Sequence, residues 1–431
     1  MNKNKRIGIL ASVMALLLQA GNVNAQLVKE VGLRLKNRAK QNIIQKATAK
    51  VDRKISKTAE ASGTNSNVEA GNSKGSVTSV NGNNVGYKSK FDFIPGEKIL
   101  WYEDFTGNAV GDFPLQWNTN STGEIVTIDG SATKWLKIGK NGLFMPRTIN
   151  SLPENFTLQF DLMANKAFSY YSPELNIEFA ALTNKKEYTQ LEKFKPHNKN
   201  VVDLWLHPEN AAATAGHSGF SIFEKGNEQS KNEINTSRFF SGKGPATVKV
   251  SIWRQQQRLR VYLDEEKIWD LPQAFNSVIK FNSLVFMLHS LHQKEDHYFL
   301  SNILFAAGAA DTRHKLLNEG KFVTHGILFD DGSDKIKTAS YGILKEIAAF
   351  LKENSNAKLK IVGHTDNNGD EQSNTELSKR RALAVKNSLC KDPGIDTGRI
   401  ETDGKGEKEP ADNNNTVTGK ANNRRVEFVK L

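Results

Sequence analysis

An arginine interrupts the apolar stripe of a predicted helix near the C-terminus. Leu377, Arg381, Val385 and Leu389 recur at helical spacing, so one member of a row of core candidates carries a permanent charge. Its guanidinium either snorkels to water or binds an anion. Asp366 directly follows a predicted strand, at the edge where open α/β sheets place their ligands. This acid and this arginine therefore identify the region as a candidate binding site.

Alternating strands and helices are predicted to position these two side chains. Apolar residues alternate within the predicted strands and recur at three or four residues within the predicted helices. Ser373 and Glu376 fit a capping box at the start of the second helix. The predicted strands are 326–329, 358–364, 400–404 and 425–429, and the predicted helices are 341–354 and 375–390. We expect a small α/β domain over residues 321–431.

Five ordered motifs in this region resemble the C-terminal domain of the OmpA family. They read FDDGSDKI, GHTDNNG, NTELSKRRA, GKGE and NNNTVTGKANNRRVEF, in the order and spacing of that family, over about residues 322–431. The first motif departs most from the pattern, so Asp330 and Gly332 are expected only to shape a loop beside the pocket. The family is known for non-covalent binding of peptidoglycan, and the resemblance implies the same activity for this domain.

The resemblance also implies which residues bind the wall peptide. Asp366 and Arg381 fall on the principal ligands for diaminopimelate, whose ammonium requires a carboxylate and whose carboxylate suits the two parallel donors of a guanidinium. A structural ion pair between Asp366 and Arg381 is the alternative. The peptidoglycan-binding residues that the resemblance implies are Asp366, Arg381, Asn374, Thr365, Arg424 and Arg425.

Residues 91–307 contain many short alternating segments, which predict an all-β sandwich of two sheets. ENFTLQFDL and ATVKVSIW each alternate apolar and polar residues, and the segment KVSIWRQQQRLRVYLDEEKIWDLP predicts a hairpin, with RLRVYLD and EEKIWDLP as successive strands. The opening EDFTGNAVGDFP, this hairpin and the ending FLSNILFA resemble the jelly-roll domains of the concanavalin A-like lectin and glucanase superfamily. The sandwich is expected to present a surface that binds glycan or an envelope protein.

An alternative function for the sandwich is glycoside hydrolysis. Glu174, Asn176 and Glu178 resemble the acidic signature of retaining jelly-roll glucanases, but the central aspartate is replaced by asparagine. Two carboxylates four residues apart on a strand begin about 13 Å apart, whereas a retaining mechanism needs roughly 5 Å. We therefore interpret the segment as an ordinary strand with its apolar residues inward. The histidines and aspartate of 289–297 are interpreted as a polar loop, and most tryptophans as core.

The N-terminal 90 residues predict a signal, a helix and a linker. Residues 1–25 have the basic start, short apolar run and small-residue end of a secretory signal peptide. Residues 26–61 predict a basic amphipathic helix that lies on an anionic membrane surface, pairs with a partner helix or acts as a spacer. Residues 62–90, rich in Gly, Ser and Asn, predict a flexible linker, and residues 308–320 predict a second short linker.

Charge and compartment limit the partners. The formal charge of +12 permits nucleic acid, anionic lipid or an acidic polymer, but export argues against nucleic acid and favours the carboxylate-bearing wall. A single cysteine, Cys390, allows no intramolecular disulfide. We expect a non-enzymatic protein without cofactor, metal or catalytic residues, in the periplasm at the outer membrane and cell wall of a Gram-negative envelope.

Overall fold

The computed structural model describes residues 91–431 except 129, 167, 187–198, 243, 290–295, 309–311 and 392–393. The predicted signal peptide, basic helix and first linker lie outside the described residues. All of the described residues belong to one compact unit, residues 86–431. Within the described part of the chain, no helix has the length and apolar character needed to cross a bilayer.

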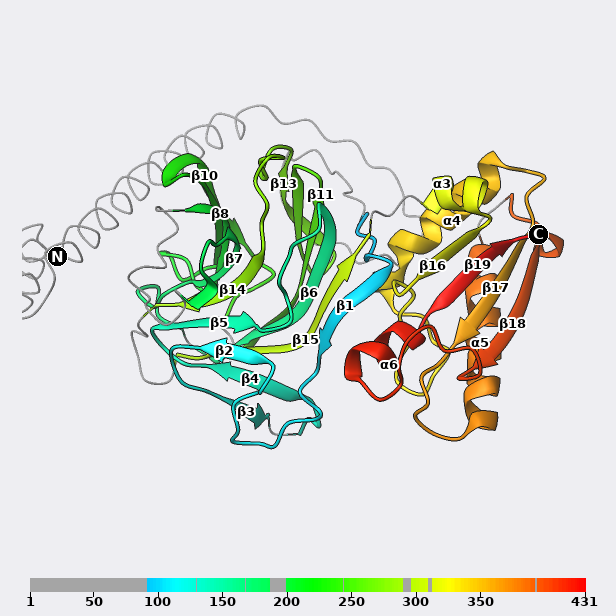
Figure 1. The fold of residues 1–431 in the computed structure, drawn as a ribbon, viewed down its shortest axis with the longest axis horizontal. Helices are drawn as coiled ribbons and strands as arrows, with labels where there is room; N and C mark the ends of the chain where they lie inside the picture. The colour runs from blue at the N-terminus through cyan, green and yellow to red at the C-terminus, as the bar shows by residue number, and fades with distance from the viewer. Residues whose placement is uncertain are drawn as a thin grey trace, which may run out of the picture. The chain divides into compact units, whose positions relative to one another are not determined.

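Two antiparallel sheets form the middle of the chain (Figure 1). The eight-stranded sheet has the order β13-β12-β11-β6-β15-β4-β3, and β1 also pairs with β15. Its strands are β1 (Lys98–Glu103), β3 (Gly123–Thr127), β4 (Lys134–Ile138), β6 (Asn155–Ala164), β11 (Ala246–Gln255), β12 (Arg258–Leu263), β13 (Glu266–Leu271) and β15 (Tyr298–Ala307). The predicted hairpin is confirmed as β12 and β13.

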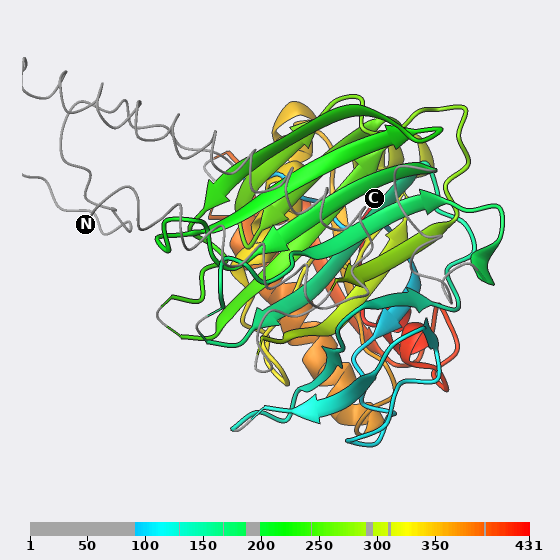
Figure 2. The ribbon, with the colours of Figure 1, turned by 90° about the vertical axis from the view of Figure 1, so that its left-hand side faces the viewer.

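The seven-stranded sheet has the order β10-β9-β8-β7-β14-β5-β2, and Figure 2 looks onto its green strands, which run side by side. Its strands are β2 (Trp117–Thr119), β5 (Gly142–Pro146), β7 (Leu175–Ala181), β8 (Asn200–His207), β9 (Gly216–Glu224), β10 (Asn227–Thr236) and β14 (Ser283–Leu288). One large apolar core takes side chains from both sheets, among them Phe156 and Phe160 on β6 and Phe179 on β7. The two-sheet packing agrees with the alternation in the sequence; the jelly-roll resemblance remains a prediction.

A four-stranded sheet with helices follows. The strands are β16 (Lys321–Thr324), β17 (Leu359–His364), β18 (Ile400–Gly406) and β19 (Val426–Lys430), in the order β16-β19-β17-β18. β17 and β18 are parallel, and the other two pairs are antiparallel. The helices are α3 (Thr312–His314) with a π-helical turn to Glu319, α4 (Tyr341–Glu353), α5 (Glu371–Leu389) and α6 (Val417–Asn423), with 3-10 turns at Thr338–Ser340 and Thr397–Arg399.

Two local predictions in this domain were wrong. Residues 326–329 form a loop with one isolated bridge from Phe329 to Ile336, because Leu328 bonds the Ser340 hydroxyl and the Lys337 amide instead of a neighbouring strand. α5 begins at Glu371, four residues before the predicted start, because the Asp370 carboxylate accepts a hydrogen bond from the Ser373 amide and caps the helix. The other predicted ends of strands and helices in the domain are confirmed within two residues.

Small residues let α5 lie close to the sheet. Its buried positions are Asn374, Ser378, Ala382, Val385 and Leu389. The predicted stripe is confirmed at Val385 and Leu389, whereas earlier in the helix Ser378 and Ala382 point inward, one position after the predicted Leu377 and Arg381. A Cβ atom at Gly363 would lie 2.4 Å from the Ser378 carbonyl oxygen, and one at Gly404 would lie 2.3 Å from the Lys379 amide nitrogen. Both strands therefore need glycine where the helix backbone crosses them.

Candidate functional site

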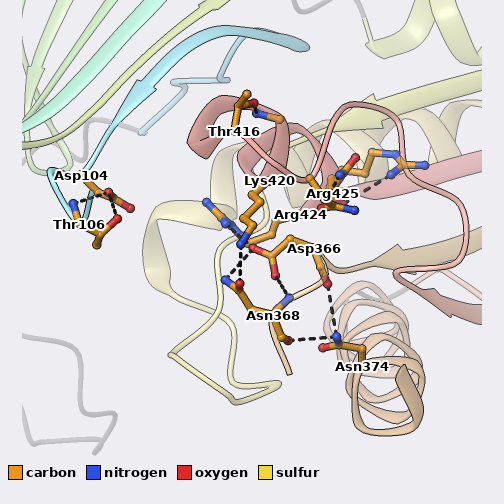
Figure 3. A network of polar contacts seen from close by, with 12 residues as sticks. Asp104, Thr106, Asp366, Asn368, Asn374, Thr416, Lys420, Arg424 and Arg425 are labelled. Carbon is orange, nitrogen blue, oxygen red and sulfur yellow. Dashed lines mark hydrogen bonds and ion pairs between the residues drawn. The ribbon is translucent and has the colours of Figure 1, made fainter. Parts of the chain in front are cut away.

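Asp366 lies two residues past the end of β17 and is buried, with only 6% of its surface exposed. One carboxylate oxygen accepts a hydrogen bond from the Asn368 amide at 3.1 Å, which tightens the loop. The other oxygen lies 2.5 Å from Nη1 of Arg424, whose side chain is 40% exposed. Asp366 is thus a buried carboxylate with a partly exposed ionic partner, and Figure 3 shows the two side chains meeting.

Asn374 fixes the loop that carries Asp366. It lies on the buried face of α5, and its side-chain amide donates to the backbone oxygens of Asp366 at 3.3 Å and Asn368 at 3.0 Å. The same amide lies 2.6 Å from a carboxylate oxygen of Glu407. Figure 3 shows Asn374 below the loop, on the side away from Arg424. Its place is that of a positioning residue for Asp366.

Arg381 is half-buried and is held by uncharged groups. Its Nε donates to the Ser333 carbonyl at 2.9 Å, and its guanidinium carbon lies 4.9 Å from the centre of the Phe329 ring. Burial lowers the pKa of Arg381, while the nearby charges of Asp331 and Asp366 favour its cationic form. No carboxylate among the described residues lies within 4 Å of this guanidinium, so the expected alternative, an Asp366–Arg381 ion pair, is not formed. Its two terminal nitrogens are left for another acceptor.

The loop before α4 supplies the groups that fix Arg381. Gly332, with φ of +59°, turns the loop, and the Ser333 amide bonds the Asp330 carbonyl. Asp330 and Gly332 thus shape the loop, as the sequence indicated. Phe329 and Ser333 were missed, because an aromatic residue and a backbone carbonyl carry no motif.

Thr365 and Arg425, which the sequence also predicted to bind, make contacts inside the domain instead of joining the side chains around Asp366. Thr365 is buried, and its amide bonds the Gly406 carbonyl between β17 and β18. Arg425 is buried and donates to Glu427 at 2.8 Å and to the Glu409 carbonyl at 3.1 Å. Because successive side chains of an extended chain point to opposite sides, only Arg424 of this pair reaches Asp366. The structure therefore places Arg425 in an internal network.

A histidine next to this network should make the protein sensitive to acid. Burial, with the charges of Arg425 and Arg424, lowers the pKa of His325 from 6.5 to about 4. The unfolded chain binds this proton more readily, so the stabilisation is complete above pH 6.5 and is lost as the pH falls toward 4. We expect His325→Phe to remove about 2 kcal/mol of the stability lost between pH 7 and pH 4.5. Urea unfolding at pH 7 and pH 4.5 measures it, with exposed His314→Gln as the control; equal losses in His325→Phe and wild type would contradict it.

The polar residues Asn176 and Glu178 of β7 belong to a buried polar cluster with Asp203. Leu175, Ile177 and Phe179 point into the main core, as expected, but Asn176 and Glu178 on the opposite face are buried as well. The Asn176 amide bonds both oxygens of Asp203 across the sheet, at 3.0 and 3.1 Å. Burial and the charge of Asp203 raise the pKa of Glu178 well above its ordinary value. The polar side chains of β7 therefore lie on the face opposite the main core, but that face is covered.

The remaining candidates divide between core and surface. Trp101, Trp117, Trp135, Trp253 and Trp269 are buried, as most tryptophans were expected to be. Trp205 is partly exposed on β8; its ring lies across Gly219 and 5.1 Å from the His217 ring. In the 289–297 segment, Asp296 is buried and accepts a hydrogen bond from Ser172, and His292 lies outside the described residues. The described residues include no group of three or more side chains suited to a metal ion.

The C-terminal sheet and helices form a small α/β domain, in which a buried acid follows a strand end and a half-buried arginine lies on a neighbouring helix. Residues 328–424 match the family model described as "OmpA family". The C-terminal part of the chain is therefore an OmpA-family domain.

Known relatives share this domain with the chain. "Outer membrane porin F" of Pseudomonas aeruginosa is 40% identical over 101 residues, which are 23% of this chain and 29% of the porin. "Probable lipoprotein YiaD" of Escherichia coli is 38% identical over 105 residues, which are 24% of this chain and 48% of the lipoprotein. The crystal structure of the peptidoglycan-associated lipoprotein from Burkholderia pseudomallei covers 24% of this chain and 88% of that chain, with 27% identity and a TM-score of 0.23. The chain covers less than half of either curated relative.

Proposed function

We propose that the C-terminal domain binds peptidoglycan non-covalently by gripping diaminopimelate of the stem peptide. This proposal rests on the contacts of the Arg381 guanidinium. Its Nε and its flat face are occupied, yet among the described residues no anion pairs with it. A half-buried cation without a partner is costly, and a ligand carboxylate removes that cost. Two terminal nitrogens of a guanidinium match the two oxygens of a carboxylate.

Asp366 supplies the complementary charge. The head of diaminopimelate carries an ammonium beside its carboxylate, and a buried carboxylate is the natural partner for an ammonium. Arg424 occupies one oxygen of Asp366 in the unliganded protein, and its partial exposure allows it to move aside or to share the carboxylate. Asn374 keeps the Asp366 loop in place while this exchange occurs. Thr365 and Arg425 support the strand ends around the pocket.

The place of the protein and the role of its sandwich belong to the same proposal. We infer a periplasmic protein at the outer membrane and wall of a Gram-negative envelope. Its similarity to an outer membrane porin and to a probable lipoprotein supports this. The sandwich presents a surface for glycan or an envelope protein. The partly exposed Trp205 ring supports the glycan option, because aromatic faces stack on apolar ligand surfaces. Glycoside hydrolysis by Glu174 and Glu178 is less favoured, because Glu178 is fully buried.

Binding to two matched peptides tests the proposal. We expect the protein to bind a soluble stem peptide that ends in diaminopimelate at least about 30-fold more tightly than the same peptide ending in lysine. Lysine keeps the side-chain ammonium, which Asp366 would bind. It lacks the second carboxylate of diaminopimelate, which Arg381 would bind. Isothermal titration of the full chain measures both affinities. Equal affinity for the two peptides, or no binding to either, would refute the proposed recognition.

A further inference from the structure

The OmpA-family domain is attached to the edge strand of the sandwich through α6. The side-chain oxygen of Asn422 accepts a hydrogen bond from the backbone amide of Ile99 at 3.0 Å, and its side-chain nitrogen donates to the Ile99 carbonyl at 2.9 Å. A neighbouring strand would make the same two bonds. Thr418 accepts a hydrogen bond from the Tyr102 amide at 3.1 Å. Ala421 packs in a small apolar cluster with Ile99 and the partly buried Tyr102. Two residues of β1, Ile99 and Tyr102, are thus held by α6.

The same helix continues to the candidate site. Lys420 on α6 donates to the side-chain oxygen of Asn368 at 2.7 Å, next to Asp366 in the same loop (Figure 3). Arg424, the residue after α6, pairs with Asp366, and its guanidinium carbon lies 5.6 Å from the centre of the Tyr102 ring. One guanidinium therefore bridges the ring of a sandwich residue and the acid of the site.

We propose that Tyr102 of the sandwich is a positioning residue of the wall-peptide site, where its ring holds the Arg424 guanidinium beside Asp366. This inference rests on the proposed function. The ligand ammonium and Arg424 compete for Asp366, so Arg424 needs a second contact that survives when the ligand enters. A ring face provides such a contact without adding a charge. Held there, Arg424 stays close enough to meet the ligand carboxylate together with Arg381.

The environment of Tyr102 suits this role. Burial, and next the charge of Asp104, raise the pKa of Tyr102 to about 12, so the ring stays a neutral phenol at physiological pH. Its backbone amide is tethered to Thr418, which limits the movement of the ring relative to α6. The residue lies outside the segment that matches the OmpA family, so the site takes one of its parts from the neighbouring domain.

A double-mutant cycle on the full chain tests the inference. The probe is the stem peptide that ends in diaminopimelate, and its affinity is measured for Tyr102→Leu, Tyr102→Phe, Arg424→Gln and the pair Tyr102→Leu with Arg424→Gln. We expect Tyr102→Leu to weaken binding about 3- to 10-fold, because an aromatic contact to a partly desolvated cation is lost. Tyr102→Phe keeps the ring and should bind within about twofold of wild type. In the Arg424→Gln background, Tyr102→Leu should have no further effect, because Tyr102 acts through Arg424.

The outcomes separate this inference from the proposed function. If wild type fails to bind the peptide, the proposed function is refuted and this inference falls with it. If wild type binds and Tyr102→Leu binds equally well, only the role of Tyr102 is refuted. An equal loss from Tyr102→Leu with and without Arg424 would also overturn it. Thermal unfolding checks that each variant is folded, and Tyr102→Met serves as a second variant of similar size without a ring.

Discussion

Asp366→Asn lowers the affinity for the diaminopimelate peptide about 100-fold, the largest effect on binding that we expect from a single substitution. The amide keeps the shape of the carboxylate, and its oxygen can still accept the hydrogen bond from the Asn368 amide. It cannot neutralise an ammonium in a site that is only 6% exposed. It also leaves Arg424 without its anion, so two cations then face the incoming ammonium.

The matched control for this prediction is Asp403→Asn. Asp403 lies on the neighbouring strand β18 and pairs with Lys360 at 3.1 Å and Lys405 at 3.5 Å. Its loss removes an ion pair of the same domain without touching the pocket, and partly exposed pairs contribute only about 1 kcal/mol or less. Titration with the peptide should separate the two variants clearly. If both bind as wild type does, or both lose affinity equally, Asp366 has no specific role in recognition.

Gly363→Ala should lower the free energy of unfolding by about 3 kcal/mol, the largest effect on stability that we expect. The added Cβ would lie 2.4 Å from the Ser378 carbonyl oxygen and 3.1 Å from its carbonyl carbon. Both atoms are backbone, so no rotamer change relieves the contact and α5 must move off the sheet. Because Asn374 and Arg381 lie on the same helix, peptide affinity should fall as well.

Urea unfolding of the full chain measures this effect, with Gly398→Ala as the control. A Cβ at Gly398 would meet its nearest atom, a carboxylate oxygen of Asp396, at 3.5 Å, an ordinary contact distance. We expect that variant to change stability by less than about 0.5 kcal/mol. A Gly363→Ala protein as stable as the control would show that α5 does not need the close contact with β17.

The sequence predicts the pocket better than the contacts inside it. Asp366 and Arg381 could be named because an acid after a strand and an arginine among apolar helix positions are visible as patterns. The pairing of Asp366 with Arg424 could not be predicted. It depends on how the backbone brings a residue 58 positions later in the sequence back to the Asp366 loop. The inward face was predicted correctly at Val385 and Leu389 but was displaced by one position earlier in α5, since Ser378 and Ala382 are too small to register as an apolar stripe.

The sandwich shows the limit of alternation as a guide. Alternating residues predicted its strands and the inward side chains of β7, because a strand presents successive residues to opposite faces. Alternation does not reveal what covers the second face, and there Asn176 and Glu178 proved buried. The contact of Tyr102 with Arg424 joins residues 322 positions apart, which no local pattern reports.

The Asn422 side chain bonds the backbone of Ile99 as a neighbouring strand would. The sandwich and the C-terminal domain are therefore not independent pieces that can be separated without effect. Among the strands that the structure describes, β15 is the one that pairs with β1, and an open strand edge invites pairing with other chains. The C-terminal domain therefore acts as a lid on the edge of the sandwich as well as a binding module. Cutting the chain between the two would expose the backbone of Ile99 and leave the sandwich prone to join other copies edge to edge.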